Sequence, residues 1–228
     1  MIIKGLQKLT LLDFPGKIAC TVFTAGCDLR CPFCHNAALV TKIDDGIIPE
    51  EEFFAFLEGR KGRLDGVAIT GGEPLMQKGI EDFIARIKKM GFLVKLDSNG
   101  TYPDTLERLL KSGNVDYVAM DIKNSPEKYS LTSGVAVDIE TIKRSVKIIM
   151  DSGVDYEFRT TVPKELFEEA DFVKIGEFIR GAKRYFLQEF TDSGNLIEEG
   201  FSAETKENMQ KYLAAVTPYV LSGEIRGI

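Results

Sequence analysis

The sequence predicts an α/β fold of parallel strands, either an incomplete (β/α)6 TIM-like barrel or an open doubly wound sheet. Three observations predict it: six short β-branched or apolar runs, amphipathic helical segments between them, and a length of 228 residues. Strands that alternate with helices pair in parallel through right-handed crossovers. A closed eight-unit barrel usually needs about 250 residues, so six units are expected to leave a barrel incomplete.

The six predicted strands are short β-branched or apolar runs separated by helical stretches. They cover residues 18–24, 65–71, 92–98, 116–123, 155–162 and 184–190.

Helical periodicity predicts the connecting elements. The segment 49–59 begins with a proline and acidic residues, as a helix N-terminus often does. The segments 79–91 and 138–153 each place four apolar side chains on one face and end at a glycine. Because no linker or internal repeat interrupts the pattern, we expect a single domain over residues 1–228. Its core is expected at about 18–190, followed by a C-terminal helix and a further strand within 191–228.

Composition narrows the classes of function. The net charge is −6, whereas nucleic-acid-binding proteins usually carry a basic patch, so no nucleic-acid partner is expected. No apolar run approaches the roughly 20 residues of a membrane span, and the N-terminus lacks the pattern of a secretory signal. We therefore predict a cytoplasmic protein without a membrane partner. In that reducing compartment, clustered cysteines are typically metal ligands or catalysts rather than disulfides.

Three of the four cysteines and the single histidine lie within "GCDLRCPFCHN", residues 26–36. Zinc would need four ligands, and Cys34 and His35 are adjacent, which is awkward for one tetrahedral ion. A dithiol redox pair in "CPFC" would leave Cys27 without a role. "CPFCH" also matches the c-type haem-attachment motif, but haem is attached in exported proteins and no export signal is expected here. Three thiolates on a short loop suit a [4Fe–4S] cluster with one iron free of protein ligands. Cys20, within a predicted strand, is expected to be a small buried hydrophobe.

Polar residues and glycines follow the later predicted strands. In either architecture these carboxyl ends meet where ligands bind, so the side chains are expected to gather at one mouth with the cysteine loop. They are Gly71, Gly72, Glu73, Asp97, Ser98, Asn99, Asp121 and Lys123, with Arg159 and Gln188 inside the last two strands.

The spacing C-x3-C-x2-C, with Phe33 before the last cysteine, resembles the radical S-adenosylmethionine superfamily. "TGGEP" (70–74), "DSNG" (97–100) and "DIK" (121–123) follow in order, and "DFPG" and "CHN" fit as well. Over about residues 8–190 the set resembles the branch that activates glycyl radical enzymes, particularly the activating proteins of anaerobic ribonucleoside-triphosphate reductase. The resemblance implies the incomplete barrel, with cluster and cofactor at its C-terminal mouth.

The resemblance also implies a chemistry. Cys27, Cys31 and Cys34 would hold one [4Fe–4S] cluster, whose open iron binds S-adenosylmethionine. Reductive cleavage of that cofactor would give a 5′-deoxyadenosyl radical, which abstracts hydrogen from a glycine of a partner enzyme. No catalytic side chain is expected beyond the cluster and cofactor, because such chemistry belongs to the cofactor.

Roles for the other residues follow from the same resemblance. Gly71, Gly72 and Glu73 are expected at the methionine ammonium, and Ser98 and Asn99 at its carboxylate or the ribose. Asp121 is expected near the ribose and Lys123 on the carboxylate, while Arg159 is expected either on the carboxylate or ribose or in a salt bridge within the barrel. Gln188 and the backbone of Phe33 are expected at adenine. Asp97 and Asp121 are expected to share a small cation. His35 has no assigned role.

The expected partners are a glycyl radical enzyme and an external reductant such as flavodoxin or ferredoxin. The chain has no second cysteine set for auxiliary clusters. Two enzymatic alternatives stay open: a radical enzyme acting on a small molecule, and an activase of another glycyl radical enzyme. An iron–sulfur electron carrier or redox sensor is the alternative from a different class.

Overall fold

The computed structural model describes residues 1–41 and 46–227, in which eight strands form one sheet in the order β1 to β8. β1 pairs antiparallel with β2, and every pair from β2 to β8 is parallel. The strands are β1 (Ile3–Thr10), β2 (Ala19–Thr24), β3 (Gly66–Gly71), β4 (Leu93–Ser98), β5 (Tyr117–Asp121), β6 (Asp155–Val162), β7 (Tyr185–Glu189) and β8 (Gly223–Arg226).

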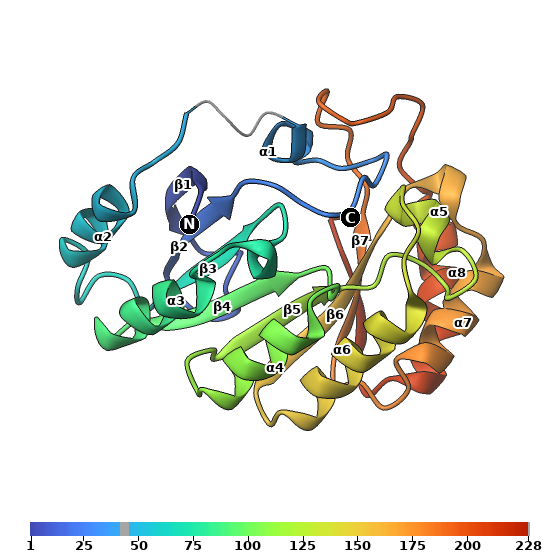
Figure 1. Ribbon diagram of the computed structural model, residues 1–228. Helices are drawn as coiled ribbons and strands as arrows, with labels where there is room; N and C mark the ends of the chain where they lie inside the picture. Colours follow the sequence, from blue (N-terminus) through green and yellow to red (C-terminus); the bar gives the residue numbers. More distant parts are fainter. Residues whose placement is uncertain (42–45, 228) are drawn as a thin grey trace.

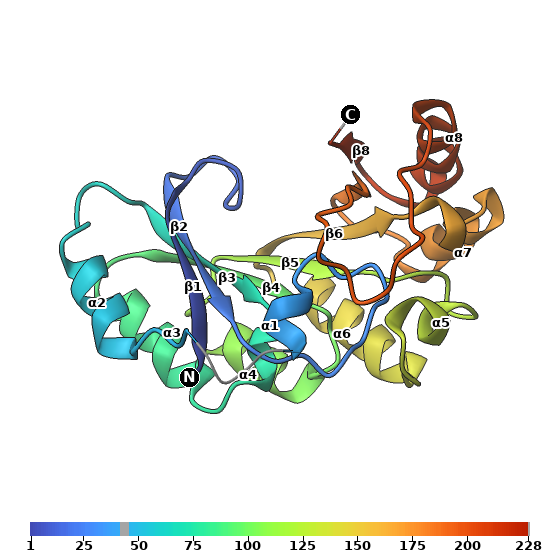
Figure 2. The same cartoon turned by 90° about the horizontal axis from the view of Figure 1, so that it is seen from above.

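The sheet is curved and open, with helices on its convex side (Figures 1 and 2). Because β1 and β8 do not pair, the barrel is incomplete, as predicted. The sequential strand order rules out the doubly wound alternative, in which the order reverses within the sheet. The helices are α1 (Ala37–Thr41), α2 (Glu50–Glu58), α3 (Ile80–Lys89), α4 (Pro103–Lys111), α5 (Tyr129–Ser133), α6 (Ile139–Asp151), α7 (Glu169–Phe178) and α8 (Lys206–Val216).

The predicted strands correspond to β2–β7, and the three predicted helices to α2, α3 and α6. The expected C-terminal helix and strand appear as α8 and β8, while Ile228 lies outside the described residues. β1 was not predicted. Its sequence, IKGLQKLT, mixes apolar residues with glycine, glutamine and lysines, and it forms an edge strand with two irregularities in its register. Edge strands carry a weaker apolar pattern than central ones.

The core lies between the convex face of the sheet and the helices. Apolar side chains of β3 and β4, such as Ile69 and Leu96, pack in one cluster with those of α3. Cys20 belongs to this cluster and is fully buried, as predicted, and burial raises the pKa of its thiol to about 12. The alternation of strand residues then turns the opposite side chains toward the barrel interior.

The floor of the barrel, at the opposite end from the mouth, is closed by Phe14 of the "DFPG" segment. The Phe14 ring packs on Tyr117, with 6.2 Å between ring centroids. A Cβ atom on Gly66 would approach Phe14 to 2.9 Å, so the glycine makes room for this ring. The "DFPG" segment thus has a packing role in this fold.

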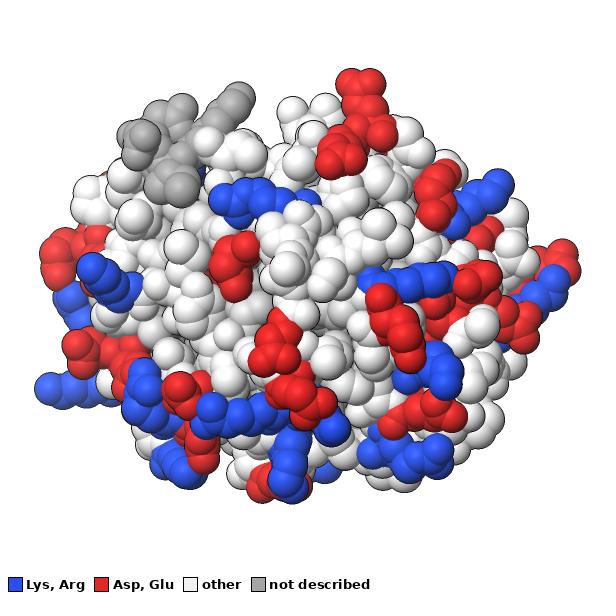
Figure 3. All heavy atoms as spheres, turned by 45° about the vertical axis from the view of Figure 1, so that its right-hand side comes forward, with Lys and Arg blue, Asp and Glu red and all other residues white. Residues whose placement is uncertain are grey.

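On the face in Figure 3, basic and acidic side chains intermingle. Ion pairs such as Arg144–Asp104 and Lys147–Asp151 join neighbouring charges along the helices. Among the described residues, no helix has the length and apolar character to cross a bilayer.

Candidate cluster and cofactor site at the barrel mouth

A cavity at the carboxyl ends of the strands brings the cysteine loop together with most of the predicted site residues. Its lining includes all three loop cysteines and eight of the predicted residues: Phe33, Gly71, Gly72, Ser98, Asn99, Asp121, Lys123 and Arg159. Asp97 and His35 line it too. The prediction that strand ends gather these groups at one mouth is therefore confirmed for the residues named above. Glu73 and Gln188 are not part of the lining.

The cysteine loop presents its thiols from an apolar setting. Cys31 is buried, Cys27 and Cys34 are half-buried, and all three pack in one cluster with Phe33 and Phe190. Burial raises the pKa of Cys27 to about 12 and also raises that of Cys31. The thiols of Cys27 and Cys31 stay protonated in this setting unless a metal displaces the proton, because metal ligation deprotonates a thiol outright.

The residues fit an iron–sulfur cluster better than a single ion. Within the described residues, no group of three or more His, Cys, Asp or Glu side chains could hold one metal ion. A [4Fe–4S] cluster instead takes one thiolate per iron, so its ligands stand apart around a shared space. Hydrogen-bond donors already face Cys27 Sγ: the Leu29 amide nitrogen at 3.4 Å and Asn99 Nδ2 at 3.7 Å. Such donors to sulfur are a means of tuning cluster potential.

A buried polar atom beside the loop supports the same fit. Ser133 Oγ, at the end of α5, is the one buried side-chain polar atom without a hydrogen-bond partner in the described part of the chain. The Ser133 carbonyl accepts from the Arg30 amide nitrogen at 2.9 Å, which ties α5 to the loop. Buried polar groups are normally satisfied, so this hydroxyl leaves a donor unused in a residue whose backbone contacts the cysteine loop at Arg30.

The two glycines after β3 let that strand approach the cysteine loop. A Cβ atom on Gly72 would lie 1.8 Å from the Gly26 carbonyl oxygen, and Gly71 has a φ of +116°. The Glu73 amide nitrogen donates to the same Gly26 oxygen at 2.8 Å. Asn36, of the "CHN" motif, donates from Nδ2 to the Gly71 oxygen at 3.2 Å. These contacts fix the loop against the end of β3.

Glu73 lies behind the cavity wall, with no exposed surface. Its carboxylate accepts hydrogen bonds from the Ser98 hydroxyl at 3.0 Å and from the amide nitrogens of Leu75 and Asn99 at 2.9 and 2.7 Å. Burial raises the pKa of Glu73 to about 8, although these hydrogen bonds oppose the shift. In this geometry Glu73 positions Ser98 and Asn99, and its contact with a cofactor ammonium stays a prediction.

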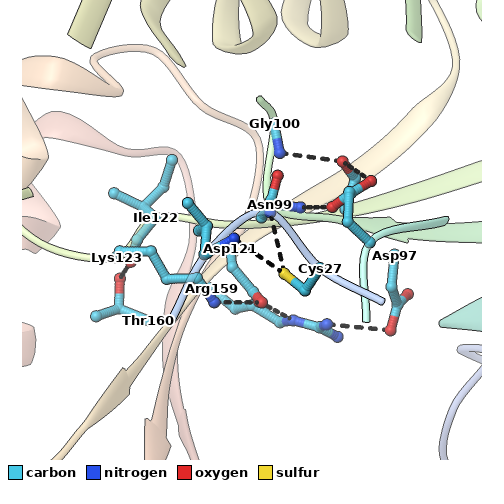
Figure 4. A network of polar contacts seen from close by, with 12 residues as sticks. Cys27, Asp97, Asn99, Gly100, Asp121, Ile122, Lys123, Arg159 and Thr160 are labelled. Carbon is cyan, nitrogen blue, oxygen red and sulfur yellow. Dashed lines mark hydrogen bonds and ion pairs between the residues drawn. The ribbon is translucent and has the colours of Figure 1, made fainter. Parts of the chain in front are cut away.

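Asp121 and Lys123 share one side of their segment, as the strand alternation predicted, and Lys123 Nζ lies 2.9 Å from Asp121 Oδ2. Arg159 bridges two carboxylates: its Nε lies 2.6 Å from Asp121 Oδ1, and its Nη2 lies 3.0 Å from Asp97 Oδ2 (Figure 4). Of the two alternatives for Arg159, the barrel salt bridge is thus present. Burial would raise the pKa of Asp121, but Arg159 and Lys123 outweigh it and hold that pKa well below its usual value.

Three phenylalanine rings pack in one cluster with the cysteines, and the His35 ring contacts one of them. The Phe33 ring is buried and packs edge-on against Phe190 and Phe201. The His35 ring stacks at a tilt on Phe190, with 5.4 Å between centroids, and burial lowers the pKa of His35. Gln188 pairs in register with Thr161, which does line the cavity, but its own side chain does not.

Two further polar residues of the site were missed from the sequence. Lys95 is buried and forms an ion pair with Asp97. Asp28 Oδ1 accepts from Asn99 Nδ2 at 3.0 Å, next to Cys27. A lysine two positions before Asp97 in an otherwise apolar strand was a usable signal, since the two must share a face.

Known proteins place this geometry in a family. The sequence profile of the radical S-adenosylmethionine superfamily matches residues 21–176. A protein of Methanocaldococcus jannaschii named as a glycyl-radical enzyme activating enzyme is 34% identical over 207 residues, covering 87% of this chain and 83% of its own. A pyruvate formate-lyase-activating enzyme of Streptococcus mutans is 26% identical over 198 residues, covering 80% of this chain and 73% of its own.

Solved structures share the fold. SuiB of Streptococcus suis, bound to S-adenosylmethionine, superimposes with a TM-score of 0.69 at 16% identity, over 90% of this chain and 49% of its own. A domain of a pyruvate-formate lyase-activating enzyme from Bacteroides vulgatus gives a TM-score of 0.59 at 19% identity, over 71% of this chain and 99% of its own. Together with the profile match and the M. jannaschii relative, this shows that the chain belongs to the radical S-adenosylmethionine superfamily, within its family of glycyl-radical enzyme activating enzymes.

Proposed function

We propose that this enzyme activates anaerobic ribonucleoside-triphosphate reductase by abstracting a hydrogen atom from a glycine of that partner. The superfamily's [4Fe–4S] cluster and S-adenosylmethionine supply the chemistry, reductive cleavage to a 5′-deoxyadenosyl radical. The observation that carries the proposal is the mouth cavity, which is lined by three thiols and by the half-buried cation Lys123. The reductase as partner rests on the "DFPG" and "CHN" segments of the sequence.

The side chains divide the work of holding the two groups. Cys27, Cys31 and Cys34 would ligate three irons. Lys123 would bind the methionine carboxylate. Lys123 and Arg159 are basic residues that line the cavity, and Lys123 is the one whose charge acts on the thiols of Cys27 and Cys31. Asp121 keeps Lys123 protonated. Burial lowers the pKa of Lys123, but Asp121 more than reverses this and raises it above its usual value.

The remaining residues would orient the cofactor. The backbone at Gly71 and Gly72 is open to the cavity and would approach the methionine ammonium. Ser98 and Asn99, fixed by Glu73, would contact the methionine or ribose. The Phe33 backbone and Gln188 would contact the adenine.

The chain supplies one redox centre, because no cysteines beyond the loop and Cys20 occur in the sequence. An external one-electron donor of the flavodoxin or ferredoxin type is therefore part of the proposal. The open edge between β1 and β8 suits a polypeptide substrate, since a glycine within a partner's chain needs lateral room.

Two measurements test the proposal in order. Reconstituted, reduced protein incubated with S-adenosylmethionine should form 5′-deoxyadenosine, and a Cys31→Ala variant should not. Equal, background-level product in both proteins would favour an iron–sulfur electron carrier or redox sensor.

The partner is tested by electron paramagnetic resonance. Anaerobic incubation with the large subunit of anaerobic ribonucleoside-triphosphate reductase should give the doublet of a glycyl radical. Pyruvate formate-lyase is tested in parallel as a second partner, because similar proteins are named pyruvate formate-lyase-activating enzymes. A doublet with the lyase alone would reassign the partner. If the protein cleaves the cofactor but gives no doublet with either enzyme, a small-molecule substrate would be favoured.

A further inference from the structure

Five charged side chains, two of them buried and three half-buried, form an alternating row from the barrel interior to the mouth. Lys95 and Asp97 belong to β4, Asp121 ends β5, Arg159 lies in β6, and Lys123 follows β5. We propose that Arg159 acts as an internal cation between Asp97 and Asp121, so that this protein binds no metal cation there. Arg159 is then a positioning residue that holds Asp121, and through it Lys123, in place for the cofactor.

Every oxygen of the two carboxylates already has a cationic partner. Arg159 Nη2 lies 3.0 Å from Asp97 Oδ2, and Arg159 Nε lies 2.6 Å from Asp121 Oδ1. Lys95 pairs with Oδ1 of Asp97, and Lys123 lies 2.9 Å from Oδ2 of Asp121. Figure 4 shows the guanidinium of Arg159 pointing between the two carboxylates. Hard cations need several oxygen ligands, and here each candidate oxygen is engaged.

The charge balance points the same way. Three basic and two acidic side chains give this row a net charge of +1, in a place where Lys95 is 3% and Arg159 16% exposed. The adjacent acid, Glu157, is neutralised from the floor by Arg226. A metal cation would add positive charge to a site that already has an excess, and charge is costly at low dielectric unless it is paired. The excess instead suits an anion, such as the carboxylate that we assign to Lys123.

The backbone fixes Arg159 in this place. Asp121 and Arg159 are direct partners in the parallel register of β5 and β6, and Asp97 stands on the next strand, opposite Ala119. The guanidinium therefore ties β4, β5 and β6 together at the level of the mouth. Arginine stays charged at any physiological pH, so the internal cation cannot be lost by dilution, as a bound ion can.

The test compares the wild type with Arg159→Met and Arg159→Lys, as anaerobically reconstituted proteins freed of adventitious metal by chelation. Each is measured in tetramethylammonium chloride, then with sodium, potassium, magnesium or calcium at matched ionic strength. The first readout is the thermal unfolding midpoint by circular dichroism. The second is the dissociation constant for S-adenosylmethionine by equilibrium dialysis. Arg184→Met is the matched control, because Arg184 pairs with Asp155 away from the mouth.

For the wild type and Arg184→Met, we expect the midpoint and the dissociation constant to be independent of the cation, within about twofold for the constant. Arg159→Met leaves two carboxylates facing a gap, so its affinity should fall about tenfold in tetramethylammonium and recover with a small metal cation. A purely structural role for Arg159 would give a loss that no cation rescues. Arg159→Lys should keep much of the affinity without added metal.

A wild type that is stabilised by, or needs, one of the metal cations overturns the inference, and this result does not depend on how the variants fold. Absence of rescue in a folded Arg159→Met protein also contradicts it. The inference rests on the proposed function only for the second readout. If the wild type binds no S-adenosylmethionine in any salt, the proposed function fails, while the unfolding midpoints still decide whether a metal cation occupies the row.

Discussion

Arg226 of β8 and Glu157 of β6 form a two-pronged ion pair across the barrel floor, with Nη1–Oε1 at 2.7 Å and Nη2–Oε2 at 2.9 Å. The Glu157 side chain is 1% exposed, and the Tyr117 hydroxyl donates to it at 2.8 Å. The guanidinium also lies 3.3 Å from the centroid of the Phe186 ring. This pair joins β8 to β6 across the intervening strand β7.

Arg226→Met should therefore destabilise the protein by about 2 kcal/mol, because it leaves a buried carboxylate with one neutral partner. The value lies below that of a fully buried pair, since Arg226 is 38% exposed. Urea unfolding followed by circular dichroism measures the change. Adding Glu157→Gln should restore part of it. A double variant less stable than Arg226→Met would show that the stranded charge was not the cause.

Glu157 also predicts a dependence of stability on pH. Burial raises its pKa, but Arg226 and Tyr117 outweigh this and leave the pKa below the usual 4.5. An acid with a lowered folded-state pKa contributes stability above its unfolded pKa and loses it as pH falls through the folded value. Unfolding free energies from pH 7 to pH 3 should fall less steeply below about 4.5 for Glu157→Gln than for the wild type. Parallel curves would contradict the assignment.

Gly72→Ala should displace the cysteine loop. Its Cβ would lie 1.8 Å from the Gly26 carbonyl oxygen, a backbone atom that cannot move alone. We expect a loss of about 1–3 kcal/mol, typical of overpacking, and less iron retained per chain after reconstitution. Gly59→Ala is the control: at that helix end the φ is −70°, and the nearest atom stands at 3.5 Å. Full iron content in Gly72→Ala would mean that the loop adapts.

Lys123→Met tests the carboxylate role proposed for that side chain. Removing this half-buried cation should raise the dissociation constant for S-adenosylmethionine by about tenfold or more, because a charge-assisted contact is worth about 1.5–3 kcal/mol. Iron content should stay near that of the wild type. Lys128→Met is the matched variant, since Lys128 pairs with Glu168 and Asp171 and does not line the cavity. An unchanged affinity in Lys123→Met would remove it from the cofactor site.

Strand alternation and the carboxyl-end rule were enough to predict the mouth. They placed Asp121 and Lys123 on one side and gathered the glycines and Asn99 around the cysteines. The pairing of Arg159 with two acids could not be read in the same way, because it depends on the register between β5 and β6 and on side-chain reach from β4. β1 was not predicted because an edge strand needs little apolar content. The position of Glu73, fully buried behind the cavity wall where it holds Ser98 and Asn99, depends on tertiary packing that the sequence pattern does not show.

The separation of β1 from β8, which do not pair with each other, has a mechanical consequence. A closed barrel can widen only by breaking a ladder of backbone hydrogen bonds, whereas this sheet can spread at its two ends with every ladder intact. The side-chain pair between Arg226 and Glu157 stands near one of those ends and would act as a stop on that spreading. Flexibility for admitting a bulky chain and rigidity around the thiols can therefore reside in different parts of one sheet.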